Sequence, residues 1–271
     1  MGIGKVLGGS RSEWREAGAS RTAFPSGAWE REEREKRANT GIIVALPVEC
    51  RSLGVRLRHK GDGVRLPSGV RVMLSGAGPD NARRAAETLI EQGANALVSW
   101  GCCAALQPEL RPGDLLLPEA VWADGVSYAI DPAVRQHWRE GLNLRQTPRG
   151  GLLVQSASIV ADAAAKRALA QRTGALAVDM ESGAVAQAAD AHNLPCLVLR
   201  AVADPLDFTL PSSVLDNTDA DGNTSLPGLL LSLACHPGQL PALLALGRHF
   251  GAAMDALKQA AGTGELACRK T

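Results

Sequence analysis

The sequence predicts an α/β protein in which helices cover the faces of a buried sheet, and three observations favour this class. Short apolar runs, of the length of buried strands, alternate with longer segments in which small and apolar residues recur at helical spacing. The length of 271 residues suits one α/β domain or two smaller domains. The composition is 45% hydrophobic and 21% charged, with a formal net charge of +1. This balance excludes a wholly disordered chain, and the lack of a basic excess argues against nucleic-acid binding.

The composition divides the chain into one domain and two ends. Residues 1–39 mix opposite charges with Gly and Ser, so we expect a disordered charged tail. We expect a single domain over residues 40–262 and a frayed C-terminus over residues 263–271. The N-terminus lacks the apolar core and cleavage site of a signal peptide, and no run of about 18 apolar residues occurs. The six cysteines form no C-x-x-C pair, which favours reduced thiols in a cytoplasmic protein without a metal site.

The expected strands and helices follow from apolar runs and from start and stop residues. Apolar runs bounded by Gly or Pro predict strands at residues 41–46, 70–74, 96–100, 114–121, 175–178 and 195–203. Pro79 suits a first helical turn and Gly93 a C-terminal stop, so a helix lies between them. Helical spacing predicts further helices at residues 159–171, 180–192 and 237–257. Residues 205–225 are rich in Pro, Ser, Asn and Asp and predict a long loop, which the strongly apolar residues 226–233 follow.

Two glycine-rich segments follow expected strands, at positions where open α/β sheets bind ligands. The first contains Ser75, Gly76 and Gly78, and the second contains Gly101 and Cys102. A glycine loop that opens a helix offers backbone N–H groups to an anion. Neither segment has the third glycine of the dinucleotide fingerprint or the lysine of a P-loop. The pattern therefore fits either an anion site or a tight turn between a strand and a helix.

Carboxylates follow three of the expected strands. Glu49 comes after the first strand, Asp179 and Glu181 stand at a helix start, and Asp204 ends the last strand. Each of them alone also fits a structural role, because acidic residues stabilise helix starts and cap strand ends. Together they would hold the hydroxyls of a sugar and protonate a leaving base.

Four segments occur along the chain in a fixed order: GIIVALPVE, SGAGPDNA, SWGCCAAL and AVDMESGAVAQAADAHNLPCLVLRAVAD. Together they resemble the nucleoside phosphorylase and nucleosidase superfamily, over about residues 40–205. That superfamily includes purine and uridine phosphorylases and the methylthioadenosine/S-adenosylhomocysteine nucleosidases. The resemblance implies a three-layer α/β/α sandwich of the phosphorylase/hydrolase-like type, with a mixed central sheet.

The resemblance also implies a role for each candidate residue. Asp204 would be the general acid that protonates purine N7, because adenine leaves poorly as an anion. Glu49 stands where the nucleosidases have the glutamate that activates water. Glu181 would hold the ribose hydroxyls while Met180 packs against the sugar. The implied substrate-binding residues are Met180, Glu181, Asp179, Ser75, Gly76, Gly78, Gly101, Cys102, Ser158, Ile159 and Phe208.

Three departures from the family pattern bear on this site. Ala203 replaces the serine that precedes the catalytic aspartate, which removes one orienting hydrogen bond. Ser158 and Ile159 fall where a phenylalanine often stacks on the purine, so Phe208 or Trp100 would be the aromatic neighbour. No arginine stands near Ser99, where hexameric phosphorylases bind phosphate. Phosphate would then depend on backbone amides, on Arg51 or on a neighbouring subunit.

A narrower resemblance concerns the ALPVEC-R start, the GCCAAL segment and the tail DADGNTSLPGLLLSLACHPGQLPALLALGRHF. These look like the hopanoid-associated phosphorylases, which remove adenine from adenosylhopane and leave a phosphoribosyl hopane. The expected activity is therefore phosphorolysis of adenosylhopane, with inorganic phosphate as co-substrate and no other cofactor. The leucines of the tail would line an apolar mouth or simply cover the sheet.

Two other functions stay open. Glu49, together with the missing phosphate arginine, favours a hydrolytic methylthioadenosine/S-adenosylhomocysteine-type nucleosidase. A non-catalytic nucleoside-binding or membrane-associated scaffold is the third reading, and the acid at position 204 argues against it. The expected partners are an adenine nucleoside, with or without a hopane tail, and further copies of the chain in a dimer or larger homo-oligomer. Nucleic acid is not expected, and contact with a membrane surface would be transient.

Overall fold

The computed structural model describes residues 39–141, 147–219, 222 and 236–262. Apart from Asn39, the predicted charged tail lies outside the described residues. The apolar run 226–233 and the C-terminal residues 263–271 lie outside them as well. Within the described residues, no helix is long and apolar enough to cross a membrane.

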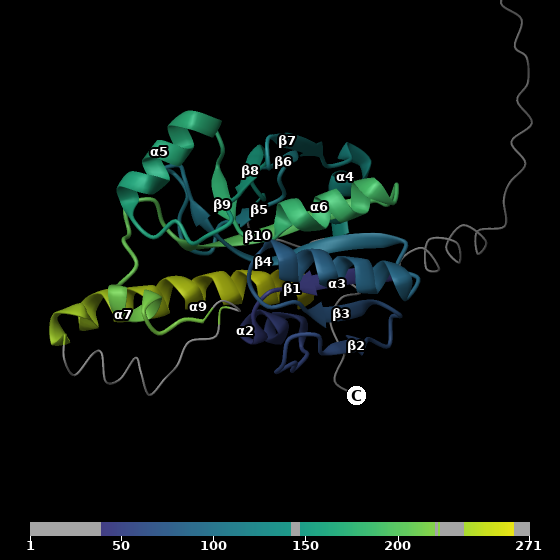
Figure 1. Cartoon of the computed structure of the whole chain (residues 1–271), viewed down its shortest axis with the longest axis horizontal. Coiled ribbons are helices and arrows are strands. Elements are labelled where there is room, and N and C mark those ends of the chain that lie inside the picture. The colour runs from purple at the N-terminus through teal and green to yellow at the C-terminus, as the bar shows by residue number, and fades with distance from the viewer. Residues whose placement is uncertain (1–38, 142–146, 220–221, 223–235, 263–271) are drawn as a thin grey trace, which may run out of the picture.

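The elements alternate between strands and helices for most of the chain (Figure 1). The strands are β1 Thr40–Val44, β2 Gly63–Arg65, β3 Arg71–Leu74, β4 Ala96–Ala105, β5 Leu115–Leu116, β6 Ala120–Ala123, β7 Val126–Ala129, β8 Leu152–Gln155, β9 Ala177–Asp179 and β10 Cys196–Asp204. The helices are α2 Pro47–Cys50, α3 Pro79–Glu91, α4 Pro132–Gly141, α5 Ala163–Thr173, α6 Ser182–Ala191, α7 Ser212–Leu215 and α9 Leu240–Gly262. Two 3-10 turns, η1 Arg51–Leu53 and η2 Pro237–Gln239, complete the described elements.

The strands form one mixed sheet. Its order is β2-β3-β1-β4-β9-β8-β6-β7, and β10 pairs with both β4 and β5. The pairs β1–β3, β1–β4, β10–β4, β6–β8 and β8–β9 are parallel. The pairs β2–β3, β10–β5, β4–β9 and β6–β7 are antiparallel. The predicted α/β class with a mixed central sheet is therefore confirmed.

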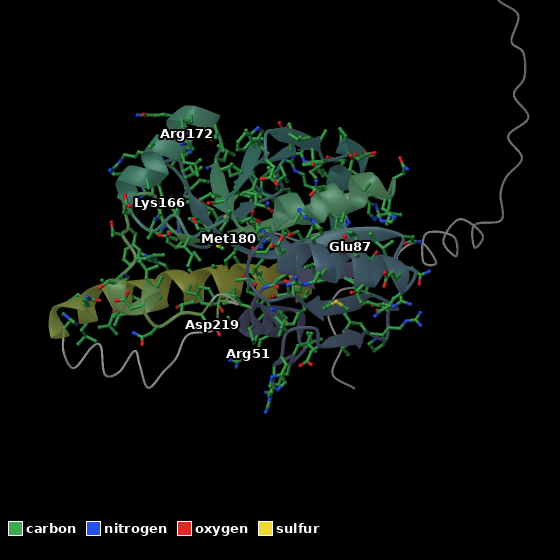
Figure 2. The ribbon with its side chains drawn as sticks, viewed as in Figure 1. Arg51, Glu87, Lys166, Arg172, Met180 and Asp219 are labelled. Carbon is green, nitrogen blue, oxygen red and sulfur yellow. The ribbon has the colours of Figure 1, made fainter. Side chains whose placement is uncertain are left out.

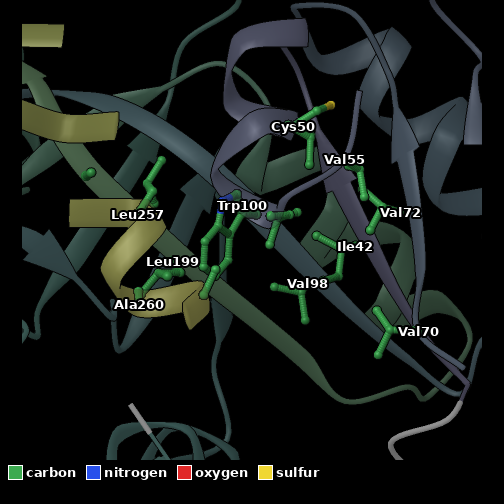
Figure 3. Packing of buried hydrophobic residues seen from close by; sticks show 14 of the residues in the cluster. Ile42, Cys50, Val55, Val70, Val72, Val98, Trp100, Leu199, Leu257 and Ala260 are labelled. Atoms are coloured by element: carbon green, nitrogen blue, oxygen red, sulfur yellow. The ribbon is translucent and has the colours of Figure 1, made fainter. Parts of the chain in front are cut away.

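Helices cover both faces of this sheet, because side chains alternate along each strand. In β1, Ile42 and Val44 join the core cluster to which α9 contributes Leu257 and Ala260 (Figure 3). Ile43, between them, joins the cluster formed with α3 and α6. The three layers of the predicted sandwich follow from this alternation.

Trp100 is part of the hydrophobic core. It is fully buried in the cluster with α9, and its Nε1 donates a hydrogen bond of 2.9 Å to Ser52 Oγ (Figure 3). The prediction that Trp100 is an aromatic neighbour of the base is therefore wrong. A large aromatic side chain in the middle of a strand is most readily accommodated by core packing.

Two predictions about strand limits were also wrong. The expected turn that begins at Gly101 is the continuation of β4, because Gly101 and Cys102 pair in parallel with Arg200 and Ala201 of β10. The expected strand 114–121 consists of two strands, β5 and β6, which pair with different partners. Pro118 lies between them and has no N–H to continue a ladder.

Some elements had no signal in the sequence or began later than expected. The short edge strands β2 and β7, the strand β8 and the polar helix α4 were not predicted. Helix α5 begins at Ala163 because Asp162 caps it by accepting a hydrogen bond from Ala165 N. Helix α6 begins at Ser182 because Asp179 still belongs to β9.

Candidate active site

Two groups of charged side chains lie along β10, at Arg200 and at Asp204. Both residues are buried, with exposed fractions of 1% and 9%. Four residues of strand separate their Cα atoms by about 13 Å. The pairing of β10 with β4 is irregular between Val202 and Asp204, so the end of the strand changes direction there.

Arg200 is the centre of the first group, which we call the Arg200 cluster (Arg200, Glu49, Asp179 and Glu181). Its Nη2 lies 2.7 Å from Asp179 Oδ2 and 3.7 Å from Glu181 Oε2. The guanidinium also donates to two buried hydroxyls, Ser99 Oγ at 2.7 Å and Ser182 Oγ at 3.0 Å. A buried guanidinium with this many partners holds the surrounding carboxylates in fixed positions.

Glu49 enters the same cluster from α2, directly after β1. Its Oε2 accepts a hydrogen bond of 3.0 Å from Leu46 N, which is the capping role expected of a carboxylate in a first turn. Its Oε1 accepts a hydrogen bond of 2.8 Å from Cys102 N on β4. Glu49 therefore caps its helix and also points into the cluster. Its geometry is compatible both with a structural role at the helix start and with a role in the candidate site.

Gly101 allows Glu49 and Arg200 to approach each other. A Cβ at this position would lie 2.4 Å from Arg200 Nη1 and 2.8 Å from Glu49 Oε1. No side chain can be accommodated at these distances without displacing a charged group. The glycine that was expected to shape a turn instead makes room between two charged side chains inside a strand.

The glycine-rich segment after β3 is tied to the cluster through Glu181. Gly78 N donates a hydrogen bond of 2.9 Å to Glu181 Oε1. Gly76 and Gly78 have φ values of 80° and 93°, which only glycine adopts readily. Ser75 is buried, with its Oγ 2.8 Å from the Gly76 carbonyl oxygen. The segment is thus a tight turn that also brings a backbone N–H group to a candidate binding residue.

Burial raises the proton affinity of the two glutamates in the cluster. Burial raises the pKa of Glu181 to about 7, against the lowering effect of Arg200. Burial likewise raises the pKa of Glu49, again opposed by Arg200. One guanidinium faces three buried carboxylates, so the cluster stabilises either a bound proton or a positively charged ligand.

Asp204 forms the second group with Lys166, a fully buried residue of α5. Lys166 Nζ lies 2.6 Å from Asp204 Oδ1. Burial raises the pKa of Asp204 to about 6, and the ammonium group of Lys166 opposes this rise. A carboxyl group with such a pKa can both carry and donate a proton near neutral pH, as general acid catalysis requires.

The loops beside Asp204 contain the remaining candidates. Leu210 N donates a hydrogen bond of 2.9 Å to Ala161 O, which joins the loop after β10 to the loop after β8. Ser158 and Ile159 lie on the latter loop and are exposed, Ile159 by 46%. Met180, half-buried between Asp179 and Glu181, lies near the centre of the molecule (Figure 2).

Phe208 faces α9. Its ring packs edge to face on His249, with the ring centroids 5.2 Å apart. Both rings line a cavity of about 280 Å³, together with Pro108, Leu110, Arg111, Pro205, Leu206 and Asp207. The residues that follow Asp204 therefore line this cavity, and the carbonyl oxygens of Pro205 and Phe208 accept hydrogen bonds from Lys166.

Residues 65–225 match the family model of the phosphorylase superfamily, which is more than half of the chain. The chain belongs to this superfamily. Futalosine hydrolase of Streptomyces coelicolor is 32% identical over 166 residues, which are 52% of this chain and 70% of that protein. Aminodeoxyfutalosine nucleosidase of Campylobacter jejuni is 29% identical over 150 residues, which are 47% of this chain and 64% of that protein.

Solved structures of the superfamily share the fold. A 5′-methylthioadenosine/S-adenosylhomocysteine nucleosidase from Neisseria meningitidis, in complex with methylthio-immucillin-A, superimposes with a TM-score of 0.60. The alignment covers 83% of this chain and 97% of that chain, at 18% sequence identity. The chain thus has the α/β architecture of these structures. The family match identifies it as an enzyme of the nucleoside phosphorylase and nucleosidase family.

Two residues that the sequence analysis did not single out lie in the candidate site, Arg200 and Lys166. Arg200 was noted as part of a strand, and its three carboxylate neighbours come from separate parts of the chain. Lys166 was counted only as part of a helix. A signal for Lys166 did exist, because it stands three residues before the buried Leu169 and hence on the apolar face of α5.

The structure also places Ser99 and Arg51, the two positions that the sequence analysis considered for phosphate binding. Ser99 is fully buried and accepts a hydrogen bond from Arg200, so Arg200 extends toward the place where an arginine was expected. Arg51 is exposed and lies apart from Met180 and Lys166 (Figure 2).

Proposed function

We propose that this chain cleaves the N-glycosidic bond of an adenine nucleoside. The observation that carries the proposal is the arrangement along β10. An acid with a raised pKa, Asp204, ends the strand, and a carboxylate-rich cluster surrounds Arg200, four residues earlier on the same strand. Cleavage of such a bond needs a proton on the leaving base and stabilisation of positive charge on the sugar, and these two regions supply both.

Asp204 is the proposed general acid at purine N7. Its Oδ1 is occupied by Lys166, while its Oδ2 accepts no hydrogen bond from the described residues. A carboxyl group with a pKa of about 6 is protonated in a useful fraction of molecules near neutral pH. Ser158, Ile159 and Phe208 are the proposed neighbours of the base, from the loops beside Asp204.

Glu181 and Glu49 are the proposed residues for the sugar and the nucleophile. Glu181 would bind the ribose hydroxyls, with Met180 against the sugar and Asp179 holding Arg200 in place. Glu49 would orient the nucleophile beside Ser75, Gly76, Gly78, Gly101 and Cys102. The excess of carboxylates over guanidinium in this cluster supports the proposal, because the sugar gains positive charge as the bond breaks.

The substrate we propose first is adenosylhopane, cleaved by phosphate to adenine and a phosphoribosyl hopane. The support is the sequence resemblance to hopanoid-associated phosphorylases at three segments, including the tail of residues 219–250. Leu240 and Leu244 of α9 have exposed fractions of 45% and 60%, so the described part of that tail does present apolar side chains to its surroundings. We also propose that the enzyme is a homo-oligomer, which light scattering on the purified protein would test.

Hydrolysis is the second candidate reaction. Glu49 lies inside the Arg200 cluster and not on a surface, which suits a carboxylate that activates water. The names of the matched relatives, futalosine hydrolase and aminodeoxyfutalosine nucleosidase, point in the same direction. The substrate would then be methylthioadenosine or S-adenosylhomocysteine.

The experiment that separates these candidates is an assay of base release with and without inorganic phosphate. The protein is incubated with adenosine, 5′-methylthioadenosine and adenosylhopane, and the sugar product is identified by mass spectrometry. A sugar 1-phosphate that forms in proportion to phosphate supports phosphorolysis. A free sugar formed at the same rate in both conditions refutes phosphorolysis, and absence of adenine in every condition refutes the proposed function.

A further inference from the structure

Lys166 is a buried lysine whose partners are all near the candidate acid. Its exposed fraction is 0%, although it belongs to the surface helix α5 (Figure 2). Its Nζ donates to Asp204 Oδ1 at 2.6 Å, to the Pro205 carbonyl oxygen at 3.0 Å and to the Phe208 carbonyl oxygen at 2.8 Å. One amino group therefore binds the acid and both ends of the loop that follows it.

These three contacts identify the protonation state of Lys166. An ammonium group has three N–H donors, whereas a neutral amine has two. All three partners are oxygen acceptors, so the ammonium form alone satisfies every contact. Burial lowers the pKa of Lys166, and the hydrogen bond and charge of Asp204 oppose that effect.

The surroundings of the pair contain few other charges. Asp162 at the start of α5 and Asp207 on the loop both favour the ammonium form of Lys166. Cys103 of β4 interacts electrostatically with Asp204, and burial raises the pKa of its thiol, so the thiol stays neutral. Within the described residues, the charge on Lys166 is therefore the main electrostatic influence on Asp204.

We propose that Lys166 is a positioning residue whose ammonium group fixes one carboxylate oxygen of Asp204 and the backbone of residues 205–208, leaving the other carboxylate oxygen for the leaving base. This inference rests on the proposed function. It also explains how the acid keeps its orientation although Ala203, the preceding residue, carries a methyl group and no hydroxyl. The hydrogen bond missing from β10 is supplied by α5.

The role of Lys166 has a consequence for the pH dependence of activity. A general acid works while it is protonated, so activity falls as the pH rises through the pKa of Asp204, about 6. Lys166 lowers that pKa. Removing the positive charge should therefore move the fall in activity to higher pH, by about one unit or more.

The experiment compares three variants of Lys166, and one control variant, with the wild type. Lys166→Gln and Lys166→Met remove the charge, and Lys166→Arg keeps it. Arg167→Gln is the matched control, because Arg167 of the same helix pairs with Asp207 of the same loop on the exposed surface. The measurements are kcat/KM for adenine release between pH 5 and 9 and the ¹³C titration of the Asp204 carboxyl group, assigned with Asp204→Asn.

We expect Lys166→Gln and Lys166→Met to raise both the titration midpoint and the alkaline limb of kcat/KM, and Lys166→Arg and Arg167→Gln to leave both in place. A uniform loss of kcat/KM with an unmoved midpoint would overturn the proposal. Failure of both charge-removing variants to fold, with Arg167→Gln folded, would also overturn it. A further outcome is that the wild type releases no adenine while the titration midpoint of Asp204 still rises in the charge-removing variants. That result would refute the proposed function and would still support the effect of Lys166 on Asp204.

Discussion

The middle and the end of β10 carry charged groups that differ in their composition. Around Arg200, one guanidinium faces the carboxylates of Glu49, Asp179 and Glu181 deep inside the protein. At Asp204, one carboxylate faces one ammonium group, and the Asp204 side chain is 12% exposed. The first region has more carboxyl groups than cations, and the second is balanced, with one of each. This difference suits a reaction that places positive charge on a sugar and a single proton on a base.

The balanced pair is the region where the loss of one group should have the largest effect on the reaction. Asp204→Asn removes the proton donor but keeps its size, so we expect base release to fall by about 10²- to 10⁴-fold. Nucleoside binding, measured by calorimetry, should persist because the Arg200 cluster is intact. Asp207→Asn, an exposed aspartate on the same loop, is the control and should retain activity. Full activity of Asp204→Asn would show that Asp204 is not the general acid.

The unbalanced cluster should respond most strongly through stability. Arg200→Met leaves three buried carboxylates without their cation, and we expect the free energy of unfolding to fall by about 3–5 kcal/mol in urea titrations. Arg200→Lys should recover part of this loss, because the charge remains and the hydrogen bonds do not. Arg84→Met, at an exposed position of α3, is the control. Equal stability of Arg200→Met and the control would show that the cluster does not depend on its guanidinium.

The spacing within the cluster is tested at Gly101. In Gly101→Ala the new methyl group would overlap Arg200 and Glu49, so we expect a loss of about 1–3 kcal/mol in unfolding free energy together with a loss of activity. Gly63→Ala is the matched control, since a Cβ at this strand position would lie 3.6 Å or more from its neighbours. If both variants unfold at the same urea concentration, the close approach at Gly101 has no energetic importance.

The last expected effect is on the pH dependence of stability. The pKa of Glu181 rises from 4.5 to about 7 on folding, so its contribution to stability is complete below pH 4.5. That contribution disappears as the pH rises from 4.5 to about 7. We expect Glu181→Gln to flatten this part of the profile of unfolding free energy against pH. Glu87→Gln, a substitution at an exposed position of α3, is the control and should leave the profile unaltered (Figure 2). If Glu181→Gln also leaves the profile unaltered, the pKa of Glu181 is not raised.

Much of the fold could be predicted, because local patterns carry it. The apolar runs gave β1, β3 and β10 nearly to the residue, and Pro79 and Gly93 marked the limits of α3. The short edge strands β2 and β7 could not be predicted, because three or four exposed residues leave no apolar period to detect. Gly101 misled the prediction, since a glycine inside a strand has the same signature as a glycine in a turn.

By itself, the sequence determined which residue types stand at the strand ends. It placed Glu49, Glu181 and Asp204 after the apolar runs, and the ordered motifs identified the superfamily, because both kinds of information are local in the chain.

The tertiary structure alone decided which charges face one another. Arg200 meets Asp179, Glu181 and Glu49, and Lys166 meets Asp204, over separations of 19 to 151 residues in the chain. The proton affinity of each acid depends on burial and on those neighbours, and neither quantity can be read from residue order.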